Sequence, residues 1–156
     1  MKKIIFILSI TLIPLTILGQ IDKKQYSENI EWINNNPSEV SNEVFVSKTV
    51  ELLNFQMFNY PNLQINVSGM KELDKELKGY KYERYFQILY SFNQLSYKLI
   101  NEKKYNSINA CIYSMEKLIQ SYKGIIKNDH SLRIEILDKY AELNEKELKR
   151  KMKSII

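Results

Sequence analysis

The sequence predicts an all-α fold, a compact bundle of about four long helices with one or two short ones. The chain of 156 residues contains only four glycines and three prolines, the residues that most often interrupt helices. Apolar residues recur at spacings of three and four over several long stretches, as they do on the buried face of a helix. One stretch, residues 61–68, alternates apolar and polar residues instead, which predicts an extended segment.

The first part of the chain has the three-part layout of a secretion signal. Two lysines follow the initiator, an uncharged apolar run comes next, and the small Gly19 precedes the polar Gln20. We expect cleavage after Gly19, so that residues 1–19 are removed and residues 20–156 form a single helical domain in the periplasm or outside the cell. An uncleaved anchor is the alternative, although the apolar run is shorter than the roughly 20 residues of a typical membrane span.

Composition narrows the classes of partner. The formal net charge is +5, and part of it leaves with the signal, so nothing suggests the concentrated basic face of a nucleic-acid-binding protein. Cys111 is the only cysteine, which excludes a disulfide within the chain. A lone exposed thiol is hazardous in an oxidising compartment, so we expect Cys111 to be buried. No later segment is apolar enough to predict a transmembrane helix.

The first half of the chain is predicted to hold two helices. Residues 26–34 form the first, which ends in a run of asparagines before Pro37. Asn36 is expected to cap the second, over residues 38–58, with Pro37 at its first position.

The extended segment over residues 61–68 follows the second helix. Leu63, Ile65 and Val67 alternate there with polar residues, and a single strand leaves its backbone groups without partners. Two interpretations stay open. The segment is either a connector laid across the helices or an exposed edge that pairs with a second copy or with another protein.

The second half of the chain is predicted to be helical almost throughout. The expected ranges are 70–78, 82–101, about 107–126, and a last region that follows Ser131 and continues to the end of the chain. Asn106 or Ser107 can cap the third of these, Ser131 can cap the last, and a break near Asn144 is possible. Helices joined by such short connections favour a bundle or a series of antiparallel hairpins.

No catalytic or metal-binding constellation stands out, so we expect no enzyme activity, cofactor or metal. His130, the only histidine, lies beside Asp129 in a polar turn without a nearby nucleophile. Cys111 has no basic neighbour one helical turn away that would favour the thiolate. Several glutamates precede lysines by four residues, which is the spacing of solvated pairs on a helix surface; Glu135 with Lys139 and Glu145 with Lys149 are examples.

The eleven tyrosines are the least ordinary feature of the composition. On the predicted helix over 82–101, tyrosines share one side with amides and a lysine, a combination that suits contact with a sugar, peptide or protein. We name as a possible interaction surface Tyr90, Asn93, Gln94, Tyr97 and Lys98, together with Leu63, Ile65 and Val67. The alternative is that the tyrosine rings cover edges of the core.

The last residues form a basic amphipathic pattern, with several lysines and Arg150 between apolar positions. Such a helix can lie on an anionic membrane surface. The alternative is an ordinary final helix, because cations are favoured near a helix C-terminus.

Several short features follow one another in a familiar order: Leu18-Gly19-Gln20, Trp32-Ile33, Pro61 to Val67, Tyr97 to Asn101, Met115 to Ile119 before Tyr122, and a Leu/Lys-rich finish over Leu143 to Ile156. In these features the chain resembles a group of small exported helical proteins of Bacteroidota to which no activity is assigned. The resemblance implies an exported helical fold and supplies no activity.

The sequence therefore predicts an exported, non-catalytic module that binds an unknown protein or peptide partner. An inhibitor or immunity-type protein that blocks an exported enzyme is the second hypothesis, and a hydrolase that uses carboxylates is the third.

Overall fold

The computed structural model describes residues 21–37 and 41–156, so the predicted signal over residues 1–19 lies outside the described residues. The described part is helical and contains no strand, which confirms the predicted all-α class. Its α-helices are α1 (Lys23–Asn35), α2 (Glu43–Asn59), α3 (Lys71–Glu76), α4 (Glu83–Ile100), α5 (Ser107–Asn128), α6 (Glu135–Glu142) and α7 (Glu145–Ile155). The finer prediction of about four long helices is corrected, because the last helical region is divided between α6 and α7.

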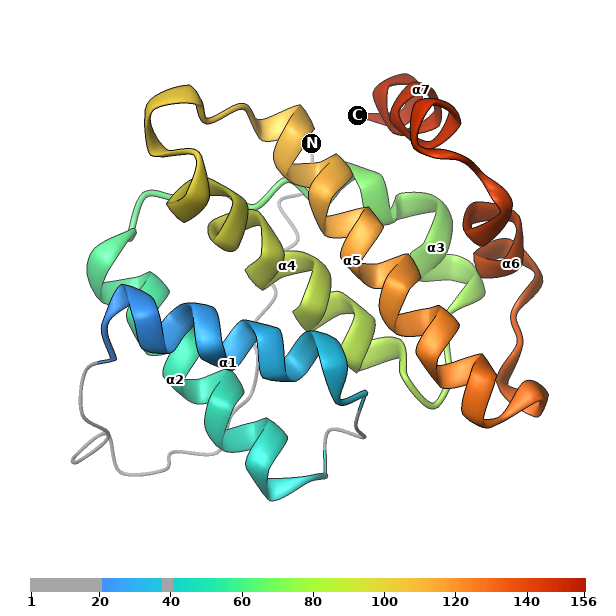
Figure 1. The fold of residues 1–156 in the computed structure, drawn as a ribbon, viewed down its shortest axis with the longest axis horizontal. Coiled ribbons are helices and arrows are strands. Elements are labelled where there is room, and N and C mark those ends of the chain that lie inside the picture. Colours follow the sequence, from blue (N-terminus) through green and yellow to red (C-terminus); the bar gives the residue numbers. More distant parts are fainter. Residues whose placement is uncertain (1–20, 38–40) are drawn as a thin grey trace.

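Helices α4 and α5 pair along their lengths and form the centre of the fold. In Figure 1 they run side by side across the middle of the molecule, with α1 and α2 on one side and α6 and α7 on the other. α1 contacts both central helices, and α2 packs on α1 and α4. The core extends through all of these layers and is rich in aromatic rings, among them the fully buried Tyr85, Phe86 and Tyr122.

Asparagine side chains fix the starts of three helices. Asn106 accepts a hydrogen bond from the backbone of Asn109 at the start of α5, so one of the two predicted caps is confirmed. Asn144 begins α7 with a capping box shared with Glu147, which confirms the predicted break. The Asn42 side chain accepts a hydrogen bond from the Phe45 backbone N–H at the start of α2.

Two predicted caps are wrong. Asn36 is the C-cap of α1, where its side-chain amide donates to the Trp32 carbonyl. The next described helix begins at Glu43, although part of the predicted start lies in residues 38–40, outside the described ranges. Ser131 lies in a short 3-10 turn, His130–Leu132, and α6 begins only after Ile134.

A polar network inside the core joins α1 to the central helices. The Tyr26 hydroxyl donates to the Phe92 carbonyl at 2.8 Å, and the Tyr85 hydroxyl donates to the Ile33 carbonyl at 2.8 Å. The side-chain amide of Asn93 donates to that of Asn34 at 2.8 Å. These bonds satisfy polar groups that would otherwise be costly to bury.

The segment before α3 is irregular from Leu63 to Val67, and a 3-10 turn, Ser68–Met70, follows it. The Asn66 backbone is bound on both sides by the buried Gln94 amide, since its N–H donates to Gln94 Oε1 and its carbonyl accepts from Gln94 Nε2, both at 2.9 Å. Leu63 packs against the core. The segment is therefore a connector laid across the helices, and the alternative of a free edge is excluded at Asn66.

Candidate functional site

Most of the interaction surface predicted on the helix over 82–101 is not a surface. Tyr90, Asn93 and Gln94 are fully buried, so the prediction that they face a partner is wrong. The reason is that α4 is covered on one side by α1 and on another by α5, which leaves little of its circumference to solvent. Asn93 and Gln94 serve the interior instead, through the hydrogen bonds to Asn34 and Asn66.

The remaining predicted residues lie near the C-terminal end of α4. Tyr97 and Lys98 are half-buried, and of the three apolar residues predicted before α3 only Val67 is exposed. The Lys98 ammonium lies over the rings of Tyr60 and Tyr105, at 5.2 and 5.5 Å from their centroids. The structure thus brings Tyr97 and Lys98 together with tyrosines from other segments, which the sequence of α4 alone does not reveal.

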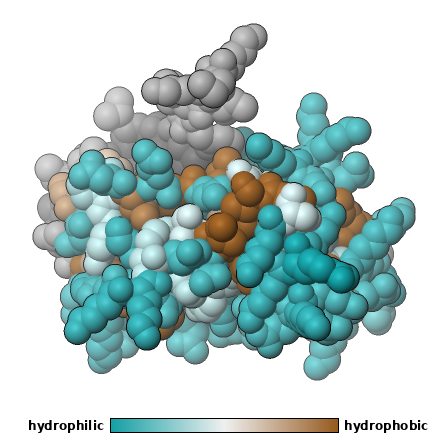
Figure 2. Space-filling model, turned by 90° about the horizontal axis from the view of Figure 1, so that it is seen from above, coloured by the Kyte–Doolittle hydropathy of each residue, from teal (hydrophilic) through white to brown (hydrophobic). Residues whose placement is uncertain are grey.

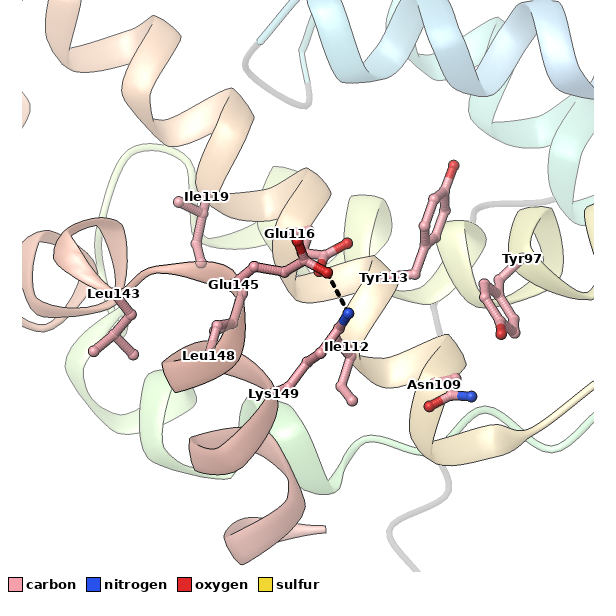
Figure 3. A pocket seen from close by; sticks show the side chains of 10 residues that line it. All are labelled: Tyr97, Asn109, Ile112, Tyr113, Glu116, Ile119, Leu143, Glu145, Leu148 and Lys149. Carbon is pink, nitrogen blue, oxygen red and sulfur yellow. Dashed lines mark hydrogen bonds and ion pairs between the residues drawn. The ribbon is translucent and has the colours of Figure 1, made fainter.

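Tyr97 belongs to a groove that opens between α5 and α7, with a volume of about 660 Å³. We call it the α5–α7 groove. It is lined by Tyr97, Asn109, Ile112, Tyr113, Glu116, Ile119, Leu143, Glu145, Leu148 and Lys149. Figure 3 shows these side chains, with the two tyrosines and Asn109 at one end and Ile119, Leu143 and Leu148 at the other.

The aromatic end of the groove is built by the α4–α5 pair. The rings of Tyr97 and Tyr113 lie 5.7 Å apart, and the Tyr105 ring, which is not part of the groove lining, lies 6.4 Å from the Tyr97 ring. Lys117 lies over the Tyr113 ring at 5.5 Å from its centroid. Tyr97 and Tyr113 lie outside the buried hydrophobic core and line the groove, where their rings can contact a ligand.

Three charged groups occupy the middle of the groove. Lys149 forms an ion pair with Glu145 one turn earlier on α7, and Glu116 approaches from α5 (Figure 3). Burial raises the pKa of the Glu116 carboxyl, and the nearby Glu145 raises it further, whereas Lys149 lowers it. No hydrogen bond or salt bridge to another described residue is found for Glu116, so its carboxylate is the least satisfied charge in the groove.

The position of α7 creates this groove. Asn144 starts the helix, and Leu148 and Met152, four residues apart on one side, are buried against the rest of the fold. This anchoring turns Glu145 and Lys149 toward α5. Seen from above the view of Figure 1, hydrophobic side chains form a patch at the centre of the surface, with hydrophilic ones on both sides (Figure 2).

Within the part of the chain that the structure describes, the other candidate side chains do not assemble into a site. Cys111 is fully buried, as predicted, and its thiol contacts the Asn66 carbonyl at 3.5 Å. Burial raises the pKa of this thiol, which disfavours the reactive thiolate. His130 is exposed, and the Asp129 carboxylate beside it accepts from Ser131. Over residues 21–37 and 41–156, no three potential metal ligands come together.

Several carboxylates pair with lysines on the same helix. Glu135 and Lys139 form the predicted surface ion pair at 2.7 Å, and Glu145 and Lys149 form another. Among the helices that the structure describes, none has the length and apolar character to cross a membrane.

We predict that Glu116→Gln raises the free energy of unfolding near pH 7, by up to about 0.5 kcal/mol. The raised pKa means that the folded state binds the Glu116 proton more tightly than the unfolded state does. This difference in proton binding therefore stabilises the fold at a pH below the pKa that Glu116 has in the unfolded chain. The stabilisation is lost as the pH rises through the higher pKa that Glu116 has in the folded protein. Urea unfolding near pH 7 and near pH 4 measures the effect.

The advantage of the Gln variant should disappear at the lower pH, where Glu116 is protonated in the wild type. Glu31→Gln, at an exposed position on α1, is the control. A Glu116→Gln protein that is less stable than wild type near pH 7 would show that the charge makes a favourable contact.

Comparisons with protein-family models, with curated proteins and with solved structures found no match.

The sequence did not predict most of the residues that line the groove. Tyr97 alone was among the predicted surface residues, and Glu145 and Lys149 were recognised only as a helix-surface pair. A signal was present on α5, where Tyr113 and Glu116 stand outside the apolar stripe.

Proposed function

We propose that this chain is an exported helical protein that binds a protein or peptide and catalyses no reaction, and that the α5–α7 groove is its binding site. The observation that carries the proposal is the lining of the groove. Apolar side chains at one end and two tyrosines at the other bracket a small number of charges. Binding sites commonly combine a mostly apolar concave surface with a few polar groups that orient the ligand.

The shape of the groove favours a chain segment over a small metabolite. The groove is open along its length, between two helices, and does not close around a small molecule. Apolar grooves between helices accept the apolar side of a helical or extended peptide, with its side chains at successive positions. Tyrosine contributes large contact area at low entropic cost, which suits Tyr97 and Tyr113 to such a role.

Selection of peptides from a random displayed library, on the protein purified from the exported fraction, tests this proposal. We expect peptides whose affinity falls about tenfold or more in the Tyr113→Ala variant, because truncation of a central aromatic anchor typically costs that much. Tyr105→Ala is the matched control, since its ring also contacts Tyr97 and lies outside the groove lining. Failure to select any peptide, or equal losses in both variants, would contradict the groove as the binding site.

Export is the other half of the proposal, and it makes a separate prediction. Removal of residues 1–19 leaves Gln20 at the N-terminus, where glutamine cyclises with loss of ammonia. Mass spectrometry of the protein from the cell envelope should find a chain that begins at Gln20, in part as pyroglutamate. A chain that retains Lys2 and Lys3 would show that the segment stays attached, as an anchor or otherwise.

A further inference from the structure

Helix α7 carries a row of cations beside the groove. Lys146, Lys149, Arg150 and Lys153 are separated by three, four and seven residues, so they share one side of the helix, and all four are exposed. We call them the basic stripe. They line a second concave surface with Asn144 and Glu145, and this surface shares Glu145 and Lys149 with the α5–α7 groove. The apolar groove and the basic stripe are therefore continuous.

Most of this charge is not neutralised within the fold. Lys149 pairs with Glu145, and Lys151, outside the stripe, pairs with Glu72 at 2.7 Å. No salt bridge between described residues involves the other three cations of the stripe. A partner that covers them must supply anionic groups, because burying uncompensated cations is costly.

The apolar side of α7 is already used inside the protein. Leu148 and Met152 are 4 % and 0 % exposed, and Ile155 and Ile156 pack against the core. A helix that binds a membrane inserts its apolar side into the lipid, and α7 has no such side to offer while the fold is intact. The stripe and groove together instead suit a partner that brings its own apolar side chains.

We propose that the partner is an acidic amphipathic peptide segment, whose apolar side chains enter the α5–α7 groove while its carboxylates contact Lys146, Arg150 and Lys153. This inference rests on the proposed function. The groove also orients the segment, because the Glu116 carboxylate repels anions from its middle, where Glu145 and Lys149 neutralise each other. The acidic residues of the partner therefore lie on the side that faces the solvent-exposed stripe, and neutral or apolar residues face Glu116.

The peptides selected from the random library provide the test. The expected pool is enriched in sequences that place aspartate or glutamate beside apolar residues. The triple variant Lys146→Gln, Arg150→Gln and Lys153→Gln should bind these peptides about fivefold more weakly or worse, since each exposed ion pair contributes a modest energy. Raising the salt from about 50 to about 300 mM should weaken wild-type binding and leave the triple variant little changed.

The control variant carries Lys75→Gln, Lys78→Gln and Lys123→Gln, which removes the same number of charges from exposed positions on other segments. It should retain affinity within about twofold, as long-range electrostatics is largely screened at physiological salt. Glu116→Gln should keep or increase the affinity for acidic peptides. A clear loss in Glu116→Gln would overturn the proposed orientation.

The other outcomes separate this inference from the proposed function. Peptides that depend on Tyr113 but show no acidic bias and no sensitivity to the stripe would overturn the inference and leave the groove as a binding site. An empty selection would overturn both. Binding of the protein to phosphatidylglycerol vesicles but not to phosphatidylcholine vesicles, lost in the stripe variant and unaccompanied by acidic peptides, would show that the stripe serves a membrane surface instead.

Discussion

Replacing Phe86 by alanine is expected to lower the free energy of unfolding by about 3–5 kcal/mol. Phe86 lies at the centre of the aromatic part of the core and is 0 % exposed. Its ring stacks on Tyr80 at 6.1 Å and contacts Tyr85 and Tyr122 at 5.5 and 6.5 Å. Truncation leaves a cavity between rings that helices on several sides hold in place, so the site cannot easily collapse. A typical domain has a stability of about 5–15 kcal/mol, so this loss is large.

Urea unfolding monitored by circular dichroism measures this change. Phe58→Ala is the matched control, because Phe58 is 65 % exposed at the end of α2 and should change stability by no more than about 0.5 kcal/mol. Comparable effects of the two substitutions would contradict the placement of the core between α4 and α5.

Gly69→Ala is expected to destabilise the protein by about 1–3 kcal/mol, the usual cost of overpacking. Gly69 is buried where the connector passes between α4 and α7. A methyl group there would overlap the Tyr90 hydroxyl and would lie 2.6 Å from Met152 Cε. The Met152 side chain can adjust, whereas the Tyr90 ring is fixed on all sides by the core, so most of the cost arises at Tyr90.

A double-mutant cycle with Tyr90→Phe tests the cause. The buried Tyr90 hydroxyl has no nitrogen or oxygen partner among the described residues and contacts only the Cys111 thiol, a weak hydrogen-bonding group, so its removal alone should cost little. Removal of the oxygen also makes room for the methyl group, and the combined variant should recover much of the stability that Gly69→Ala loses. Additive effects would show that the two positions are not in contact.

Gly124→Ala is the control for glycine itself. Gly124 lies in α5, and an added Cβ would meet nothing within 4 Å. Alanine there should stabilise the protein by about 0.5–1 kcal/mol, from helix propensity alone.

Much of the secondary structure was predictable because local signals set it. The apolar spacing of the central helices places α4 within one residue of its predicted range at each end and α5 within two. Asn106 and Asn144 mark helix starts through the short reach of the asparagine side chain. Cys111 lies on the apolar stripe of α5, which is why its burial could be predicted.

The burial of the polar residues on α4 could not be predicted from such local signals. A helix that packs on one neighbour leaves the side-chain amides of its other face in solvent, but α4 has neighbours on several sides. Hydrogen bonds with segments distant in the sequence satisfy the side chains of Asn93 and Gln94. The groove escaped prediction for a related reason. It depends on how α7 packs beside α5, and no pattern within either helix specifies that placement.

The polar network between α1 and the central helices also determines how α1 is aligned. Apolar contacts between helices tolerate a shift by one turn, since the next residues along the stripe are also apolar. Hydrogen bonds are directional and do not tolerate it. A slide of α1 along α4 would break the bonds of Tyr26 with Phe92, Ile33 with Tyr85 and Asn34 with Asn93 together. These hydrogen bonds therefore select a single register for α1 from the several that apolar packing alone would allow.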